Sequence, residues 1–469
     1  MKKEAEFTVS QIEYSKKLSE CKSGEVVAQK EKRFLVVRVS ELSEKENNLF
    51  ITILSELKRS EKQVRASADV YFFLKDYCLE NMILLNKQQR EKILELLEWE
   101  ALGESILTPL LGDPMFEEIV INGPKKQVMV YHRTFGWLTT NLEFNSEDKI
   151  RTIINKMAAP LGRQLSYQSP MLNAVLKDGS RLNASMHPIA FSGINATIRK
   201  FKENPFTPAE LSECGTISRE AMSFLWLAMQ TSCSILICGN TGSGKTTTLN
   251  ALFCFLPKEE RIVCAEETPE LMLPQSHVIK LNTAEALDIT LGSLIDNTFR
   301  MRPDRVIVGE IRNKEEAGAF INTMLAGQAK GSYATFHAES AQEAIQRLCS
   351  FGISERSLAS IDLIVVQKRI SKITSGGARK EERRVMEICE VEKTPDGAKA
   401  NALFNFDFEK NALVRIEEGA RIIEKISRTF CCKKKEIKRM ERKRTGALEK
   451  LKNKSEFVDF FASAEEVIG

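Results

Sequence analysis

Residues 239–246, with the sequence GNTGSGKT, have the residue types and the spacing of a loop that binds phosphate groups. Glycines allow the backbone to curl so that its N–H groups point at phosphate oxygens. The pattern predicts that Lys245 reaches the β- and γ-phosphates and that the Thr246 hydroxyl binds Mg²⁺. The residues expected to bind the nucleotide are Gly239, Asn240, Thr241, Gly242, Ser243, Gly244, Lys245, Thr246 and Thr247.

The segments on either side of this loop fit a strand and a helix. Residues 234–238 form a short apolar run that is typical of a buried strand. The apolar residues that recur at helical spacing after the loop are Leu249, Leu252, Phe253 and Leu256. A glycine-rich turn that merely matches the pattern is the alternative, but strand, loop and helix in this order favour a ligand. The sequence therefore predicts that the chain binds a nucleoside triphosphate.

Three further predicted strands each run into a polar residue. These strands are residues 261–265, 305–308 and 332–336, and the polar residues are Glu266, Glu310 and His337. The carboxyl ends of parallel strands meet at one edge of a sheet, where ligands bind. Hydrolysis of a nucleoside triphosphate needs a group that orients or deprotonates water, an anion that holds Mg²⁺ and cations near the γ-phosphate. The strand ends supply such groups.

The same residues also have interpretations without chemistry. His337 alone fits an ordinary histidine at a strand end, and Glu310 fits a cap of the helix that follows. The arginines near the second strand fit either a solvated cluster or phosphate contacts, of which we expect at most two. They are Arg300, Arg302, Arg305 and Arg312.

Four motifs in a fixed order carry a family resemblance, at residues 239–246, 264–271, 300–312 and 331–338. The preceding segment adds Asp113-Pro114 with Glu117-Glu118, residues 178–181 and residues 197–201. On these residues the chain resembles the secretion ATPases of the type II secretion/type IV pilus superfamily. Within it, the archaeal branch that powers pilus and archaellum assembly is the most similar. The resemblance covers about residues 105 to 400.

The resemblance implies a role for each candidate residue. Glu266 would polarise the attacking water, and Glu310 would help to hold Mg²⁺ and sense the γ-phosphate. His337 would couple the phosphate state to domain movement. Arg181 and Arg199 would reach toward phosphate from the first domain or its neighbour, as arginine fingers do.

In its acidic motif the chain departs from the common family pattern. Where the family often has Glu-Asp, this chain has Glu266-Glu267, so we assign the base role to Glu266 alone. The cofactors that the resemblance implies are ATP and Mg²⁺. The family often forms a hexameric ring of two-domain subunits, which implies a homo-hexamer that works on an integral membrane platform protein.

The predicted fold class is α/β, because strands alternate with helices after about residue 209. The resemblance implies a RecA-like phosphate-loop ATPase domain, preceded by an α+β, PAS-like domain, with helical N- and C-terminal extensions. The predicted parts are a helical region at 1–100, the α+β domain at 101–201, a linker at 202–208, the ATPase domain at 209–400 and a basic helical region at 401–469.

The composition of the chain excludes several other classes of function. The 469 residues have a net charge of +4, so the chain is not a polycation of the nucleic-acid-binding kind. Its eleven cysteines contain no C-x-x-C pair, which predicts neither a zinc site nor a redox pair and fits a reducing cytosol. No apolar run approaches the length of a membrane span. We therefore expect a soluble, cytoplasmic protein whose membrane contact is peripheral.

Residues 428–454 are rich in lysine and arginine. This basic tail predicts contact with an anionic membrane face or an acidic platform protein, or else an ordinary solvated helix. The leading interpretation of the whole chain is an ATP-driven motor for pilus or archaellum assembly or protein export. The alternative, a RecA-like ATPase that translocates nucleic acid, would need a basic domain studded with aromatic residues. We expect no nucleic acid partner, and the intact motifs argue against a non-catalytic scaffold.

Overall fold

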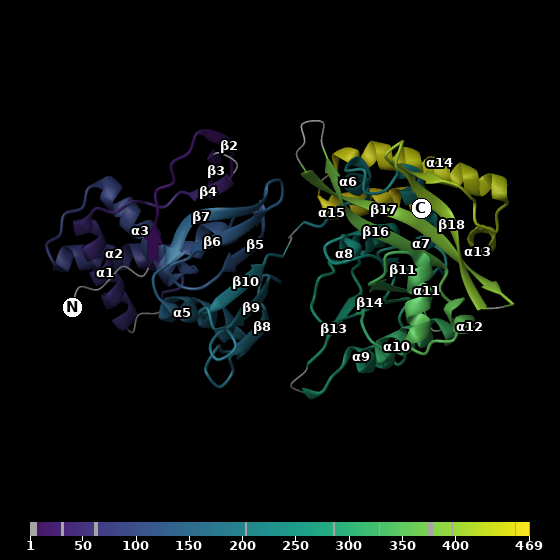
Figure 1. The fold of residues 1–469 in the computed structure, drawn as a ribbon, viewed down its shortest axis with the longest axis horizontal. Coiled ribbons are helices and arrows are strands. Elements are labelled where there is room, and N and C mark those ends of the chain that lie inside the picture. The colour runs from purple at the N-terminus through teal and green to yellow at the C-terminus, as the bar shows by residue number, and fades with distance from the viewer. Residues whose placement is uncertain are drawn as a thin grey trace. The chain divides into compact units, whose positions relative to one another are not determined.

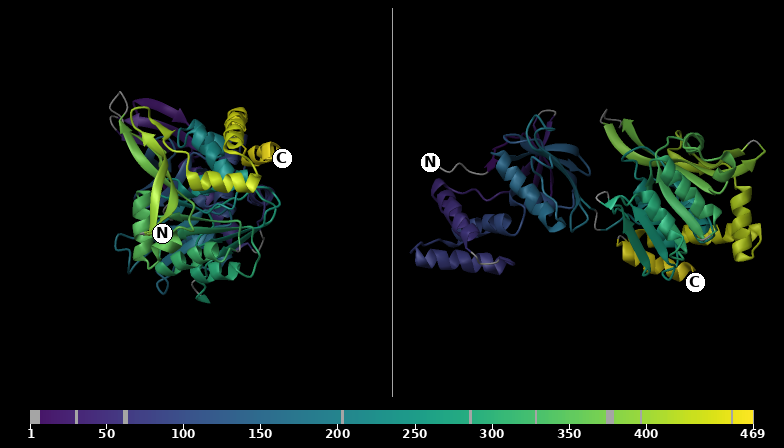
Figure 2. Two further views of the ribbon diagram at one scale, coloured as in Figure 1. Left: turned by 90° about the vertical axis from the view of Figure 1, so that its right-hand side faces the viewer. Right: turned by 90° about the horizontal axis from the view of Figure 1, so that it is seen from below.

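The chain folds into two compact units, Met1–Lys202 and Glu203–Gly469 (Figures 1 and 2). The computed structural model describes residues 7–29, 32–60, 64–201, 204–284, 287–327, 329–373, 379–395, 397–454 and 456–468. None of the helices within these ranges is long and apolar enough to cross a membrane. Each unit has its own sheet and its own hydrophobic core.

Among its described residues, the first unit contains a ten-stranded sheet in the order β2-β3-β4-β7-β6-β5-β10-β9-β8, with β1 paired to β7. The strands are β1 Phe7–Val9, β2 Lys16–Glu20, β3 Gly24–Gln29, β4 Lys32–Val37, β5 Phe116–Ile121, β6 Gln127–His132, β7 Gly136–Phe144, β8 Met171–Val175, β9 Arg181–Ser185 and β10 Asn195–Arg199. The helices are α1 Glu44–Arg59, α2 Ser67–Glu80, α3 Lys87–Ala101, α4 Thr108–Leu111 and α5 Glu147–Ala158. Residues 116–121 and 127–132 form the hairpin that the sequence predicts.

The prediction of a helical region at 1–100 is wrong near its start, where the described residues include the strands β1 to β4. These strands extend the sheet of the following domain, because β4 pairs with β7 through Phe34 and Thr139. Val26 and Leu35 are fully buried in the core of that sheet. An apolar segment that adds a strand to a sheet elsewhere in the chain gains burial that no local helix offers. Helices α1 to α3 form a small core of their own.

The second unit, within the described part of the chain, has a nine-stranded sheet in the order β13-β12-β14-β15-β11-β16-β17-β18-β19. The strands are β11 Ile235–Cys238, β12 Ile262–Glu266, β13 Val278–Asn282, β14 Arg305–Ile311, β15 Gly331–Phe336, β16 Leu363–Ile373, β17 Arg379–Thr394, β18 Gly397–Asp407 and β19 Ala412–Arg415. Neighbouring strands from β13 to β16 are parallel, and β16 to β19 form an antiparallel meander. The four strands predicted at residues 234–238, 261–265, 305–308 and 332–336 are confirmed as β11, β12, β14 and β15.

Helices cover both faces of this sheet, which is why its central strands are apolar throughout. The helices are α6 Pro208–Glu213, α7 Arg219–Met229, α8 Lys245–Leu252, α9 Leu291–Thr298, α10 Lys314–Leu325, α11 Ala341–Ser350, α12 Glu355–Leu358, α13 Ala420–Phe430, α14 Lys434–Lys450 and α15 Phe457–Ile468. Alternate residues of β11 face opposite layers. Ile235 and Ile237 pack with α7, α8 and the C-terminal helices, whereas Leu236 and Cys238 pack with α9, α10 and α11.

The predicted helical region at 401–469 begins later than expected. Residues up to Asp407 belong to β18, and Ala412–Arg415 form β19. Leu403 and Leu413 are buried in the same core as α7, so the meander is part of the second unit rather than an extension of it. The helical part starts at Ala420 with α13 and continues through α14 and α15, drawn in yellow in Figure 1.

Candidate nucleotide-binding site

The predicted phosphate loop connects the end of β11 to the start of α8. Its three glycines have positive φ angles, between 75° and 154°. The Gly239 N–H donates a hydrogen bond to the Phe336 carbonyl at 3.2 Å, which ties the loop to the end of β15. A side chain at Gly239 would overlap the Gln367 carbonyl oxygen and come within 2.6 Å of Ser243 Oγ. The first position of the loop therefore requires glycine.

Lys245, the first residue of α8, is buried against the loop. Its Nζ donates to the carbonyl oxygens of Gly239 at 3.0 Å and Asn240 at 3.4 Å. The same ammonium lies 3.6 Å from Glu310 Oε1. Burial lowers the pKa of Lys245, and the charge of Glu310 opposes that shift. Lys245 thus joins the loop to the acidic end of β14.

Glu310 reaches this position because β14 has a bulge there. Val308 and Ile311 of β14 pair with Ala334 and Phe336 of β15, so two residues of β14 lie opposite one residue of β15. Such a bulge leaves the extra residue outside the regular ladder and redirects its side chain. The predicted strand 305–308 therefore continues past Glu310 to Ile311.

The Glu310 carboxylate contacts a basic side chain on each side. His337 Nε2 lies 2.9 Å from Oε1, and Arg312 Nη2 lies 2.8 Å from Oε2. Burial alone would raise the pKa of Glu310, but the hydrogen bond and charge of Arg312 and the charges of Lys245 and His337 lower it. Burial and the Lys245 charge lower the pKa of His337. Because a carboxylate oxygen accepts hydrogen bonds, the ring N–H at Nε2 of His337 is the donor to Glu310.

Glu266, at the end of β12, is the most buried of the predicted catalytic residues, with 3% of its surface exposed. Its Oε1 accepts the backbone N–H groups of Glu270 at 2.9 Å and Leu271 at 3.2 Å. Its Oε2 is buried without a hydrogen-bond partner among the described residues. Burial raises the pKa of Glu266, which strengthens it as a base. A Cβ at Gly309 would lie 3.1 Å from Glu266 Cγ, so glycine at this position leaves room for the Glu266 side chain.

The donors around the loop suit a magnesium ion held together with nucleotide phosphates. Thr246 is half-buried at the start of α8, and the Ser243 hydroxyl is buried without a hydrogen-bond partner in the described part of the chain. With Glu310 these are oxygen donors, which Mg²⁺ prefers. Across the described ranges, no group of three or more His, Cys, Asp or Glu side chains could hold a metal ion. Mg²⁺ needs no such group, because substrate phosphates and water complete its shell.

Sequence reasoning missed Gln367, which lies on β16 directly behind the loop. Its Nε2 donates to the Ser243 carbonyl at 2.8 Å, and its Oε1 accepts the Thr248 hydroxyl at 2.6 Å. This buried amide fixes the loop to α8 and to the sheet. The apolar run 363–366 ends in Gln367, as the three other strands end in polar residues, and that pattern is the signal for it.

Arg181 and Arg199 lie in the first unit, on the adjacent strands β9 and β10. They are cross-strand partners, so their side chains leave the same face of the sheet. Arg199 is also the partner of Glu118 on β5. The Glu118 carboxylate therefore lies opposite Arg199 on the other side of its strand. Their action at the phosphate loop stays a prediction.

Of the arginines predicted near β14, Arg312 lies in the site and Arg305 does not. Arg312 pairs with Glu310 and Glu267. Arg305 is 1% exposed at the opposite, amino end of β14, where Nε lies 2.7 Å from Glu260 Oε2. Arg305 therefore fits neither of the two predicted interpretations, which were membership of a solvated cluster and contact with phosphate. Arg300 and Arg302 are exposed.

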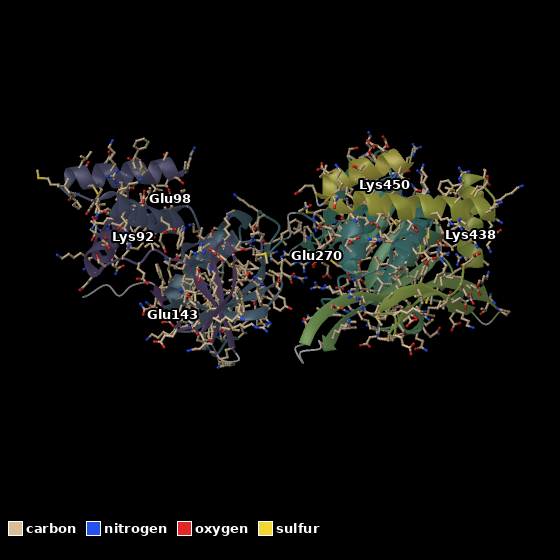
Figure 3. All side chains as sticks on the ribbon, turned by 90° about the horizontal axis from the view of Figure 1, so that it is seen from above. Lys92, Glu98, Glu143, Glu270, Lys438 and Lys450 are labelled. Carbon is tan, nitrogen blue, oxygen red and sulfur yellow. The ribbon has the colours of Figure 1, made fainter. Side chains whose placement is uncertain are left out.

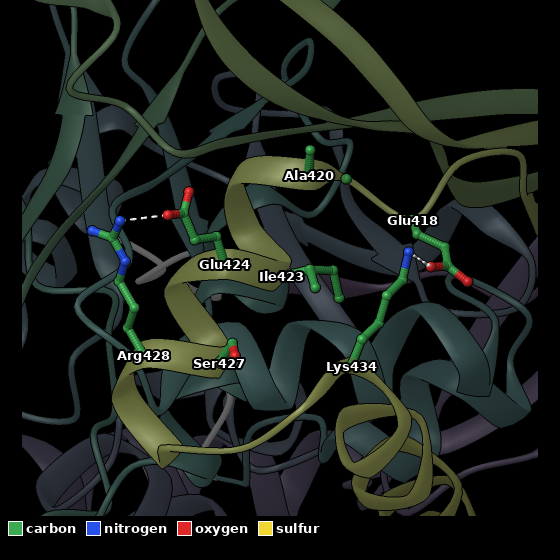
Figure 4. A pocket seen from close by; sticks show the side chains of 8 residues that line it. Glu418, Ala420, Ile423, Glu424, Ser427, Arg428 and Lys434 are labelled. Atoms are coloured by element: carbon green, nitrogen blue, oxygen red, sulfur yellow. Dashed lines mark hydrogen bonds and ion pairs between the residues drawn. The ribbon is translucent and has the colours of Figure 1, made fainter.

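A separate pocket lies at α13, away from the predicted residues (Figure 4). It is lined by Glu418, Gly419, Ala420, Ile423, Glu424, Ser427, Arg428 and Lys434. Its charged groups pair with one another, Glu424 with Arg428 and Glu418 with Lys434. Hydrogen bonds from Lys434 and Lys438 lower the pKa of Glu418 to about 2. These pairs explain the polar lining without a ligand.

Comparison with known proteins identifies relatives of most of the chain. The family described as "Type II/IV secretion system protein" matches residues 100–464. An uncharacterized protein of Methanocaldococcus jannaschii is 35% identical over 340 residues, covering 71% of this chain and 60% of that protein. The type IV secretion system protein VirB11 of Bartonella quintana is 29% identical over 315 residues, covering 56% of this chain and 87% of VirB11.

Among solved structures, the VirB11 ATPase from the Brucella suis type IV secretion system, crystallised with sulphate, is 25% identical with a TM-score of 0.32. The alignment covers 61% of this chain and 95% of that one. The chain spans less than two thirds of the M. jannaschii relative, of which it covers 60%.

Proposed function

The chain belongs to the family of type II/IV secretion system proteins, and on that premise we propose that it is an ATPase whose hydrolysis of ATP drives a secretion-like machine. The machine would assemble a pilus or archaellum filament or export protein. One observation carries this proposal: Lys245 of the phosphate loop, Glu310 and His337 form a connected set with contacts of 3.6 and 2.9 Å. A turn that matched the motif by chance would have no reason to meet two further motif residues.

The chemistry we propose starts from the loop. Its backbone N–H groups and the start of α8 would bind the β- and γ-phosphates, and Lys245 would exchange its carbonyl partners for phosphate oxygens. The Thr246 hydroxyl and Glu310 would hold Mg²⁺. That ion, when bound, offsets the negative charge that develops on the phosphates.

Glu266 would act on the attacking water. Its Oε1 is fixed by two backbone N–H groups, which leaves Oε2 to accept a hydrogen bond from water. As the water oxygen bonds to the γ-phosphorus, the bond to the bridging oxygen breaks and ADP leaves. The water proton passes to Glu266, whose raised pKa favours that transfer.

His337 would transmit changes in nucleotide occupancy of the site to the rest of the unit. Its ring contacts Glu310, and its carbonyl accepts a hydrogen bond from Arg347 on α11. Movement of Glu310 when nucleotide binds would therefore be passed to the end of β15 and to α11. This coupling follows the role that the family resemblance implies.

The finer architecture is also a proposal. We propose a RecA-like fold for the ATPase domain at 209–400 and a hexamer whose α+β domain at 101–201 supplies Arg181 and Arg199 as arginine fingers. The PAS-like description of that domain stays a prediction. The parallel sheet with the loop after β11, and the cross-strand position of the two arginines, support this architecture.

We place the motor at the cytoplasmic face of a membrane, where it would work on an integral platform protein. Helix α14 supports this placement, because Lys435, Arg439, Arg442 and Lys443 are exposed and form no ion pair within the described ranges. Figure 3 labels Lys438 and Lys450, which lie on this helix. An anionic lipid surface attracts such a cluster.

The proposal is tested by ATP turnover of the full chain, measured as phosphate release for the wild type and K245A. We expect slow turnover that K245A abolishes, because the lysine contacts the phosphates directly. Phosphatidylglycerol vesicles should raise the wild-type rate, and double-stranded DNA should not. Stimulation by DNA alone would favour a nucleic acid translocase, and an absence of turnover in every condition would contradict an ATPase.

A further inference from the structure

The sheet order separates two groups of charged residues around the phosphate loop. The loop strand β11 lies between β15 and β16. Glu266, Glu310 and His337 all come from β12, β14 and β15, on one side of β11. On the other side, β16 and β17 present Arg369 and Arg383, which are cross-strand partners. No motif and no role proposed above includes these two arginines.

Both arginines contact the loop at its glycines. The Nε group of Arg383 donates a hydrogen bond to the Gly242 carbonyl at 3.0 Å. Its Cδ lies 3.4 Å from where a Cβ of Gly244 would be. Nη1 of Arg369 lies 3.3 Å from the corresponding position at Gly242. The two guanidinium groups therefore border the turn of the loop whose backbone N–H groups are expected to bind phosphate.

The charges here are only partly compensated. Arg369 pairs with Glu381 on β17. Arg383 is exposed, and its side chain forms no ion pair and no hydrogen bond within the described ranges beyond the one to Gly242. Like charges directly opposite each other on paired strands destabilise a sheet. A bound anion offsets that cost, and the guanidinium fork is suited to phosphate oxygens.

We propose that Arg383, supported by Arg369, binds the nucleotide from within the same subunit, at the phosphate nearest the nucleoside. The inference rests on the proposed function, because it requires that the loop bind a nucleotide. Lys245, Glu310 and His337 place the γ-phosphate toward β14 and β15. The remainder of the nucleotide then extends toward β16 and β17, where Arg383 lies. Arg383 would contact the part that ATP and ADP share.

The test is binding of fluorescent methylanthraniloyl-ATP and methylanthraniloyl-ADP to the full chain, for wild type, R383Q and R383K. Loss of a charge-assisted hydrogen bond should weaken binding about tenfold or more for R383Q. The loss should be equal for the two nucleotides. R383K keeps the charge but not the fork, so its affinities should lie between those of wild type and R383Q. If R383Q does not fold, the equal loss for both nucleotides in R383K decides the question.

Three control results separate this inference from simpler explanations. R356Q removes an exposed arginine of α12 and should bind both nucleotides as the wild type does. The melting temperature of R383Q without nucleotide should not fall below that of the wild type, because Arg383 is exposed and its removal relieves the repulsion from Arg369. K245A should lose binding of both nucleotides.

Unchanged binding in R383Q, with binding lost in K245A, would overturn this inference and leave the proposed function standing. A loss for ATP alone would place Arg383 at the γ-phosphate and also overturn it. If the wild type binds neither nucleotide, the proposed function and this inference both fail.

Discussion

Lys245 Nζ and Glu310 Oε1 lie 3.6 Å apart, and the same carboxylate oxygen lies 2.9 Å from His337 Nε2. One oxygen therefore links the phosphate loop to the end of β15. If phosphate draws the Lys245 ammonium away, Glu310 loses that cationic neighbour. Its hydrogen bond with His337 then becomes stronger. We propose that Glu310 and His337 form a connection that responds to occupancy of the loop.

This connection predicts the effect of H337N, which keeps a polar side chain but shortens its reach to Glu310. We expect methylanthraniloyl-ATP to bind as tightly as to the wild type, and turnover to fall several-fold, the scale of a coupling between neighbouring sites. Binding and phosphate release, measured on the same preparation, check this. Equal losses in binding and turnover would instead make His337 a ligand of the nucleotide.

Glu266 and Glu267 are adjacent but differ sharply in environment. Glu266 is buried with a free oxygen, whereas Glu267 pairs with Arg312 at the surface. We expect E266Q to reduce turnover by about a hundredfold or more, the contribution of a general base, with nucleotide affinity retained. E267Q, the matched control, should retain most of the activity. Similar losses in both variants would contradict the assignment of the base role to Glu266 alone.

Burial of Glu266 also predicts how stability depends on pH. Its pKa is raised in the folded protein, so between the unfolded value of 4.5 and the folded value the folded state binds more protons. The contribution of Glu266 to stability is therefore complete below pH 4.5 and is lost as pH rises through the folded pKa. E266Q removes the buried charge and should have a higher melting temperature than the wild type at pH 7.5.

The measurement is the melting temperature of both proteins from pH 4 to pH 8. The difference between E266Q and wild type should grow with pH and then level off. A constant difference would show that Glu266 does not titrate in this range. It would contradict the raised pKa on which the base role of Glu266 depends.

Two glycine-to-alanine changes in the second unit should have opposite effects. In G239A the new methyl group would overlap the Gln367 carbonyl, and φ is 154°. We expect a loss of about 1–3 kcal/mol in unfolding free energy and of nucleotide binding. In G318A, on α10, the methyl group meets no atom within 4 Å, and a helical alanine should add about 0.5–1 kcal/mol. Urea unfolding of both variants checks the contrast.

The motifs allowed the core of the site to be predicted from sequence, because each motif residue follows a strand whose apolar residues are contiguous. The loop after β11, Glu266 at the end of β12 and His337 after β15 were found in this way. Gln367 was overlooked although its apolar run is a local signal, whereas Arg383 has no such signal and reaches the loop from a strand more than a hundred residues later in the chain. Such contacts follow from strand order, which local patterns do not encode.

The N-terminal region was mispredicted for a related reason. Residues 34–37 form a short apolar run, FLVV, but the charged residues around it hid the strand, and β4 pairs both with β3 and with β7, about a hundred residues away. The meander of β18 and β19 was likewise hidden in a segment whose lysines and arginines suggested a helix. In both cases tertiary pairing overrides local propensity.

Helix α14 provides the last prediction, on membrane contact. Reversing the charge of Lys435, Arg439 and Arg442 places three glutamates on its exposed face, while the helix keeps its buried residues Ile437 and Leu448. Each basic residue near an anionic surface contributes about 1 kcal/mol to binding, so the triple variant should no longer sediment with phosphatidylglycerol vesicles. Basal ATP turnover without vesicles should be unchanged, because none of the three lies at the phosphate loop.

The matched control is the triple variant K314E, R356E and K399E. It produces the same change in net charge on exposed residues outside α14. It should sediment with vesicles as the wild type does, because the attraction falls off within a Debye length of the surface. If both triple variants lose binding equally, net charge rather than α14 governs attraction to the membrane. If neither loses it, α14 is a solvated helix and the contact with the machine lies elsewhere.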